Sequence, residues 1–396
     1  MSEHSGGNEP VVIVGAGLAG YTTARELRKH DRARPLVIVT ADDGAFYSKP
    51  MLSNALAQHK APADLALKDA AGMAAELDAE ILTRTRVAAI DPAARTVTTG
   101  GGRTLSYGDL VLATGAVPVR VPLEGDAAGA VISVNHLDDY ARFRDALPDG
   151  GTVLIMGPGL IGCEFANDLA AAGHPVHVVG PAPHPLDRLL PEPAARRLQQ
   201  ALAELGVTWH LGTTVAAVER GGGTLRARLA DGTGVDAHVV LSAVGLAPDT
   251  RLAAAAGLTV NRGIVVDRHL RTSGAHVWAL GDCAEVEGLV LPFVMPLMAC
   301  ARALGATLGG TPTAVRYPPM PVTVKTPACP VVVCPPVPPV EGAWEVDEGG
   351  DGVRGLYRDG QGHLRGFALT GGRVREKQAL VKDIPPWLDG QAASDG

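Results

Sequence analysis

The sequence predicts an α/β protein in which one βαβ unit, carrying a glycine-rich turn, occurs twice along the chain. The apolar run 11–14 leads into the turn 15–20 (GAGLAG), and the run 153–156 leads into the turn 157–162 (GPGLIG). Each turn is followed by a helix-compatible segment and then by a second apolar strand. This order of strand, turn, helix and strand is typical of a doubly wound parallel sheet.

Each glycine of the pattern G-x-G-x-x-G has a physical role. The first permits the tight turn, the second lets a pyrophosphate approach the backbone, and the third lets helix and strand pack closely. The anion then lies at a helix N-terminus, where free N–H groups and the helix dipole favour negative charge. One such motif is a weak indication, but two of them, each between a strand and a helix, predict two dinucleotides and electron transfer between them.

Further buried strands indicate how the two units are arranged. Residues 110–115 and 239–245 are apolar runs that end on small residues, at matching places in the two units. A third strand, 277–280, leads into Gly281 and Asp282 after the second unit has ended. This order predicts that the second unit is inserted into the first.

We therefore expect two nested Rossmann-like dinucleotide-binding domains followed by a smaller domain. The first covers residues 1–118 and 246–316, and the second covers residues 119–245. Beyond Tyr317, proline-rich stretches and short strand-like runs replace the βαβ pattern. Residues 317–396 are expected to form a small α+β domain.

Composition narrows the classes of function. The chain has 396 residues, is 46% hydrophobic and carries a net charge of −7, which argues against a nucleic-acid or membrane-surface partner. The polar N-terminus has no signal-peptide core, and no apolar stretch reaches the length of a membrane span. Five scattered cysteines are expected of a reducing compartment. These features predict a cytoplasmic protein.

Five ordered elements resemble the two-dinucleotide flavoprotein disulfide reductase superfamily, whose fold is that of glutathione reductase. They are the two glycine motifs, the second extended by Glu164, together with A-T-G at 113–115, G-L-x-P at 245–248 and G-D at 281–282. Three segments are more closely similar to bacterial rubredoxin–NAD(+) reductases. These are 47–53 (YSKPMLS), 295–302 (MPLMACAR) and 320–327 (MPVTVKTP). The resemblance implies that NADH gives a hydride to FAD and that rubredoxin, a small acidic iron protein, accepts single electrons.

The resemblance also implies which residues contact FAD. They lie in the first domain, on the second glycine-motif helix and in the third domain: Ala16, Gly17, Leu18, Ala19, Thr40, Ala41, Lys49, Val87, Glu164, Asp282, Val294 and Lys325. The chain departs from the family where an acidic residue usually binds the adenosine ribose, because Asp42 comes one position late. Asp42 either replaces that residue or only forms a turn. Lys325 either reaches the flavin or is a surface lysine, and Val87 either meets the adenine or is an ordinary strand residue.

The second glycine motif is expected to bind NADH through Gly157, Gly159 and Gly162, with Glu164 between nicotinamide and flavin. Gly180 ends the next strand, where NAD-preferring enzymes carry an acid and NADP enzymes carry basic residues. Neither signal is present. The family favours NADH, and NADPH remains open.

The redox chemistry is expected to involve no protein thiol. Disulfide reductases carry C-x-x-x-x-C in the loop after the first unit, whereas residues 40–60 contain no cysteine. We therefore predict no catalytic side chain, no metal site and five cysteines that serve only as small buried residues. They are Cys163, Cys283, Cys300, Cys329 and Cys334.

Two alternative functions and one docking hypothesis stay open. A ferredoxin reductase of an oxygenase system shares the fold, but its loop usually reads P-P-L-S-K where residues 50–54 read P-M-L-S-N. A non-catalytic, redox-sensing flavoprotein is the other alternative. Residues 353–382 carry seven Lys or Arg against two acids. This stretch either steers the acidic partner electrostatically or is balanced by neighbouring acids.

Overall fold

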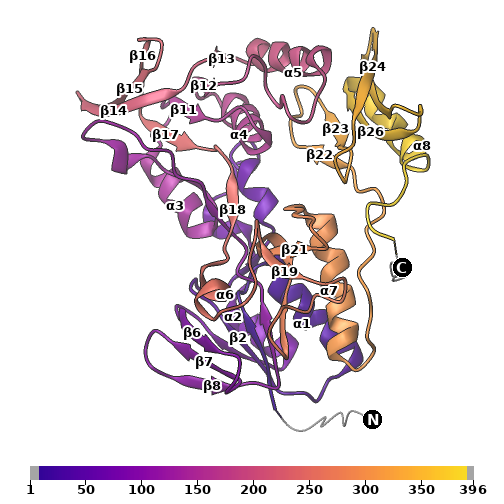
Figure 1. The fold of residues 1–396 in the computed structure, drawn as a ribbon. Helices are drawn as coiled ribbons and strands as arrows, with labels where there is room; N and C mark the ends of the chain where they lie inside the picture. Colours follow the sequence, from indigo (N-terminus) through magenta and orange to yellow (C-terminus); the bar gives the residue numbers. More distant parts are fainter. Residues whose placement is uncertain (1–8, 390–396) are drawn as a thin grey trace.

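The first unit, in the lower half of Figure 1, is built on a parallel sheet. The central strands of this sheet are buried on both faces. In this computed structural model, which describes residues 9–389, the strand order is β20-β9-β1-β2-β5. Every neighbouring pair is parallel. The strands are β1 (Val11–Val14), β2 (Leu36–Val39), β5 (Glu80–Leu82), β9 (Asp109–Leu112) and β20 (Val277–Ala279). The polar segment 1–8 and residues 390–396 lie outside the described part.

Helices cover this sheet and bring a distant segment onto it. Helix α1 (Leu18–His30) and helix α7 (Val294–Leu308) lie side by side (Figure 1). Their backbones come close at Gly305, where a Cβ would lie 2.8 Å from the carbonyl carbon of Glu26. Helix α2 (Ala70–Leu77) packs beside α1 and β5. Glycine at position 305 therefore allows α7 to seat against α1.

The second unit repeats this construction with one strand fewer. Its sheet has the order β13-β12-β11-β17, again all parallel. The elements are β11 (Val153–Met156), α4 (Leu160–Ala171), β12 (Val176–Gly180), α5 (Glu192–Glu204), β13 (Val207–Leu211) and β17 (Val239–Ser242). Each unit also carries a three-stranded antiparallel sheet after its outer strand. These are β6 (Val87–Asp91), β7 (Thr96–Thr99) and β8 (Thr104–Ser106) in the first, and β14 (Val215–Gly221), β15 (Thr224–Leu229) and β16 (Gly234–Ala237) in the second.

Short elements join the units. The chain leaves the first unit through β10 (Ala116–Pro118) and returns through β18 (Leu246–Pro248), and these two strands pair antiparallel. Strand β20 then completes the first sheet. The remaining short elements are β3 (Phe46–Tyr47), β4 (Ala66–Lys68), α3 (Leu137–Ala146), α6 (Arg251–Ala255), β19 (Ile264–Val266) and β21 (Ala284–Val286).

The C-terminal region forms an antiparallel sheet beside both units (Figure 1). Its order is β22-β23-β26-β25-β24. The elements are β22 (Val322–Val324), β23 (Val331–Cys334), β24 (Gly342–Gly349), β25 (Gly352–Asp359), β26 (Leu364–Thr370) and α8 (Lys377–Val381). The predicted fold class, two nested α/β units with a small α+β domain, is confirmed. No helix between residues 9 and 389 is both long and apolar enough to cross a bilayer.

Two helices begin at residues expected near FAD. Helix α1 begins at Leu18, and Gly17 is its N-cap. Helix α7 begins at Val294, so Val294 lies in its first turn. Pro296 lies in the same turn, where proline is tolerated because its missing N–H has no intrahelical partner.

The third glycine of each motif gives a test of this packing. We expect Gly162→Ala to lower the stability by about 1–3 kcal/mol, because its Cβ would lie closer than 3.0 Å to the Gly157 carbonyl oxygen. Gly159→Ala is the matched control, since its Cβ would meet nothing within 4 Å. Thermal unfolding of both variants measures the difference. Equal melting temperatures would contradict the proposed close packing.

Candidate active site

The two glycine turns have the same strained geometry at their first residue. Gly15 has φ +114° and Gly157 has φ +106°, a region that side chains rarely adopt. A Cβ on either would also lie closer than 3.0 Å to a carbonyl oxygen, that of Ala113 or that of Ala243. Glycine is therefore required at both positions to turn the chain from strand into helix.

The second glycine of each turn leaves an open helix N-terminus. Gly17 caps α1 and Gly159 caps α4, and among residues 9–389 no side-chain cap hydrogen bond is present at either helix. A Cβ on either would meet nothing within 4 Å, so the backbone is open to a ligand. These are the properties that a pyrophosphate site needs. The predicted second-glycine geometry is present in both units.

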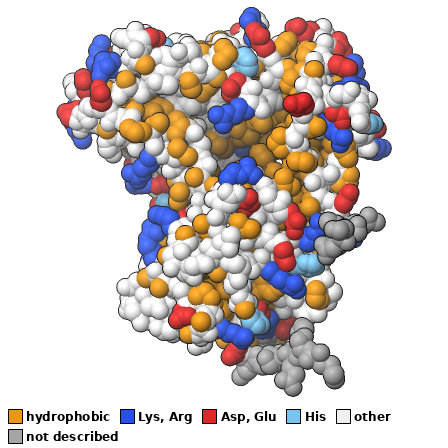
Figure 2. Space-filling view, viewed as in Figure 1, with side chains coloured by type: hydrophobic (Ala, Val, Ile, Leu, Met, Phe, Trp, Pro, Cys, Tyr) orange, Lys and Arg blue, Asp and Glu red, His pale blue; other side chains and the backbone are white. Residues whose placement is uncertain are grey.

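A cavity of about 1500 Å³ extends from the first turn toward the second unit. Figure 2 shows the surface hollowed between the two halves of the molecule. Of the residues expected at FAD, the lining includes Ala16, Gly17, Thr40, Ala41, Lys49 and Val87. Leu18, Ala19, Glu164, Asp282, Val294 and Lys325 are not part of that lining. The size and the open helix end fit a dinucleotide that binds in extended form.

In the wall of this cavity, Asp42 is both a turn former and a lining residue. Its Oδ1 accepts hydrogen bonds from the Thr40 hydroxyl at 2.6 Å and from the Gly44 N–H at 3.0 Å. It also faces the cavity together with Thr40. The two readings of Asp42 therefore describe one arrangement, in which the turn holds the carboxylate beside the expected ribose position.

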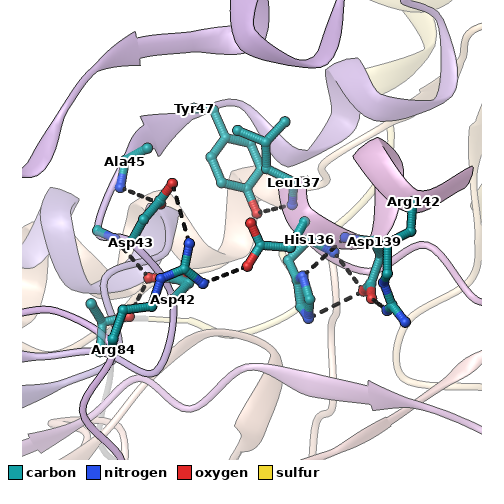
Figure 3. A network of polar contacts seen from close by, with 12 residues as sticks. Asp42, Asp43, Ala45, Tyr47, Arg84, His136, Leu137, Asp139 and Arg142 are labelled. Atoms are coloured by element: carbon teal, nitrogen blue, oxygen red, sulfur yellow. Dashed lines mark hydrogen bonds and ion pairs between the residues drawn. The ribbon is translucent and has the colours of Figure 1, made fainter. Parts of the chain in front are cut away.

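Ion pairs near Asp42 connect α3 to the first unit (Figure 3). Arg84 reaches both Asp43, at 3.9 Å, and Asp138 on α3, at 2.6 Å. The hydrogen bond from Arg84 lowers the pKa of the Asp138 carboxyl. Nearby, the hydroxyl of Tyr47 accepts from the Leu137 N–H at 3.1 Å. The sequence did not predict these pairings, because the partners are far apart in the chain.

Lys49 and Asp282 lie close enough to influence each other's charge. Burial lowers the pKa of the Lys49 ammonium, and Asp282 opposes that shift. Burial likewise raises the pKa of the Asp282 carboxyl, and Lys49 opposes that shift. Gly281, with φ +79°, brings this segment against Ala19 of α1, where a Cβ would lie 3.0 Å from the Ala19 Cβ. The G-D segment therefore lies against the helix that follows the first glycine turn.

Glu164 is buried and bonded to two other parts of the chain. Its side chain is 1% exposed. Oε2 accepts from the Ser53 hydroxyl at 2.6 Å and forms an ion pair with the Lys325 ammonium, and Oε1 accepts from the Lys325 N–H at 3.0 Å. Lys325 is thus not a free surface lysine. It extends from the end of β22 onto the helix that follows the second glycine turn.

The same face of α4 carries two more buried polar groups. Asp168 accepts from the Leu56 and Ala57 N–H groups at 2.9 and 3.0 Å. Asn167 accepts from the Ala328 N–H at 3.1 Å. Burial raises the pKa of Asp168 although these backbone bonds act in the opposite direction. The sequence carries a pattern that indicates this shared face. Glu164, Asn167 and Asp168 stand at positions i, i+3 and i+4, and residues with this spacing lie on one face of a helix.

The cysteines are buried and unpaired. The five residues expected to be structural are all free thiols in the interior. Burial raises the pKa of Cys300 to about 11 and that of Cys334 to about 12, and it raises those of Cys163, Cys283 and Cys329 as well. Neutral thiols are poor nucleophiles, so these side chains are unsuited to dithiol chemistry.

The arginines of the basic stretch 353–382 are paired with acids, which agrees with the second of the two alternatives that the sequence left open. Arg354 and Arg373 both pair with Asp347 and Glu376. The three other arginines are also paired, Arg358 with Glu345, Arg365 with Asp359 and Arg375 with Asp351. Three of these five acids, Glu345, Asp347 and Asp351, lie just before the stretch, on β24 and the turn that follows it. Counting charges inside the stretch alone therefore overstated its positive potential.

Two family models together cover both glycine turns and the C-terminal antiparallel sheet. Residues 9–305 match the family model described as pyridine nucleotide-disulphide oxidoreductase. The chain belongs to this family. Residues 314–384 match a second model, described as rubredoxin binding C-terminal domain.

Relatives within this oxidoreductase family align over nearly the full length. The chain is 51% identical to a protein of Alcanivorax borkumensis named rubredoxin-NAD(+) reductase, over 95% of this chain and 98% of that protein. It is 37% identical to a protein of Aeromonas hydrophila named nitric oxide reductase FlRd-NAD(+) reductase, over 96% and 98%. Among solved structures, a covalent putidaredoxin reductase–putidaredoxin complex matches with TM-score 0.85 and 26% identity, over 96% of this chain and 94% of that one.

The buried ion pair of Glu164 gives a second test. We expect Lys325→Met to lower the stability by about 3–5 kcal/mol, because it leaves the Glu164 carboxylate buried without its cation. The double variant Glu164→Gln with Lys325→Met should recover most of that loss. Arg196→Met, which removes an exposed pair with Glu192, is the control and should cost less than about 1 kcal/mol. Denaturant unfolding compares these three variants with the wild type. A double variant no more stable than Lys325→Met would contradict the interpretation.

Proposed function

We propose that the protein is an FAD-dependent NADH oxidoreductase that delivers electrons to rubredoxin. The observation that carries this proposal is a pair of glycine turns of the dinucleotide-binding type, together with the loop 40–60, which lies between their units and contains no cysteine. The third domain reaches that same loop through Lys325, Glu164 and Ser53. The family match over residues 314–384 and the names of the relatives support rubredoxin as the acceptor.

The first unit is proposed to hold FAD. When bound, FAD takes up a hydride and releases the two electrons one at a time. The proposed contact residues are those that line the cavity and those expected near the flavin ring. They are Ala16, Gly17, Leu18, Ala19, Thr40, Ala41, Lys49, Val87, Glu164, Asp282, Val294 and Lys325. The free N–H groups of α1 hold the pyrophosphate, and Lys49 places positive charge beside the cofactor. We retain the domain division 1–118 with 246–316, 119–245 and 317–396, which the pairing of β20 with β9 supports.

The second unit is proposed to bind the electron donor, NADH, through Gly157, Gly159 and Gly162. The open N-terminus of α4 receives its pyrophosphate. Glu164 follows this turn directly, and its bonds to Ser53 and Lys325 hold it at the place where the two units meet. Its role is to keep the nicotinamide end of the site in register with the first unit.

Rapid-mixing kinetics under anaerobic conditions test the proposed activity. We expect NADH to bleach the flavin absorbance of the holoprotein, and the reduced protein then to bleach oxidised rubredoxin with second-order kinetics. A ferredoxin is the control acceptor. Faster reduction of the ferredoxin would favour the ferredoxin-reductase alternative. Slow flavin reduction with a long-lived charge-transfer band would instead favour a redox sensor.

The electrostatic contribution to docking rests on two lysines. Within the described residues, Lys377 and Lys382 form none of the ion pairs that neutralise the arginines of 353–382. We expect Lys377→Glu with Lys382→Glu to slow rubredoxin reduction a few-fold at low ionic strength and to have no effect at high salt. Arg365→Gln, at an arginine already paired with Asp359, is the control. A rate unchanged by the double substitution at low salt would exclude steering by this face.

A further inference from the structure

The two units make matching backbone hydrogen bonds where a nucleotide's adenosine end would lie. In the first, the Thr85 N–H donates to the Thr40 carbonyl at 2.8 Å. In the second, the Thr213 N–H donates to the Gly180 carbonyl at 3.2 Å. Thr40 follows Val39, the last residue of β2, and Gly180 follows Val179 as the last residue of β12. Both therefore stand at the end of the second strand of their unit. Gly180 is therefore the counterpart of Thr40.

A second pair of bonds extends the correspondence. The Arg84 N–H donates to the Asp42 carbonyl at 2.7 Å, and the Gly212 N–H donates to the Ala182 carbonyl at 3.2 Å. Gly212 thus corresponds to Arg84, and Ala182 corresponds to Asp42. The first unit has a cation and a carboxylate at these places, whereas the second has neither.

A steric contact explains why position 180 is a glycine. Gly180 does not have the positive φ that favours glycine, so its backbone would accept other residues. A Cβ there would lie closer than 3.0 Å to Cδ and Cγ of Pro158, the second residue of the glycine turn. Ala16 takes the place of Pro158 in the first unit, where Thr40 carries a side chain. The proline ring therefore excludes any side chain at position 180.

The exclusion removes the group that usually selects between the two nicotinamide nucleotides. A carboxylate at this strand end binds the adenosine ribose hydroxyls and repels a 2′-phosphate. The adjacent groups do not replace it. Thr213 is neutral, and its buried hydroxyl has no partner among the described residues. In the loop that follows, Asp187 and Arg188 are exposed and of opposite sign.

We propose that the contact between Pro158 and Gly180 determines nucleotide selectivity, so that the second site accepts NADPH as well as NADH. This inference rests on the proposed function, because it takes the second glycine turn as the donor site. It predicts that NAD⁺ and NADP⁺ bind the oxidised holoprotein with dissociation constants within about tenfold of each other.

Calorimetric titration of NAD⁺ and NADP⁺ into the oxidised holoprotein tests the inference without relying on turnover. We expect Pro158→Ala with Gly180→Asp to shift the ratio of the two dissociation constants toward NAD⁺ by about tenfold or more. Pro158→Ala with Gly180→Asn is the matched control, having the same side-chain size without the charge, and should leave the ratio near that of the wild type. Gly180→Asp alone should lower the melting temperature, because Pro158 still fills the space.

Two results would overturn the inference. One is wild-type binding that differs by more than about tenfold between the two nucleotides. The other is a double Asp variant with the same ratio as its Asn control. A holoprotein that binds neither nucleotide would refute the donor site itself, and with it the proposed function. Binding of NAD⁺ alone would leave that function intact and overturn only the claim about selectivity.

Discussion

The carboxylate of Glu164 joins three parts of the molecule at one point. It is almost fully withdrawn from water, which is costly for a charged group unless it is paired and hydrogen-bonded. Here the cation comes from the third domain, through Lys325, and the hydroxyl comes from the thiol-free loop, through Ser53. Because neither partner lies in the second unit, the carboxylate is stable only when all three parts are in contact.

The other polar groups of α4 extend this constraint. Asp168 holds the backbone at Leu56 and Ala57, and Asn167 holds the backbone at Ala328. The helix that begins at the second glycine turn is therefore also the surface on which the loop and the C-terminal domain are positioned. The domain matched to rubredoxin binding is thus attached directly to the helix that follows the second glycine turn. Residues of the second unit, the loop and the C-terminal domain therefore meet in one small, charged cluster.

The two duplicated units share one scaffold and differ in a few side chains. Both use a glycine with positive φ, an open helix N-terminus and matching backbone bonds at the strand ends. They differ in the residue after the first glycine, which is Ala16 in one and Pro158 in the other. That single difference decides whether the neighbouring strand end has room for a side chain. At the strand ends, the charged residues Asp42 and Arg84 of the first unit have the uncharged counterparts Ala182 and Gly212 in the second.

The sequence by itself determined the α/β class, the nesting of the two units and the glycine turns, because these depend on local periodicity and on short-range steric requirements. It also identified Glu164 and Lys325 as separate candidates, and a loop without cysteine. Only the tertiary structure decided that these two residues pair, that Ser53 and Asp168 belong to the same cluster, and that acids on the preceding hairpin neutralise the arginines of 353–382. Each of these depends on distances between residues far apart in the chain, which spacing along a sequence does not encode.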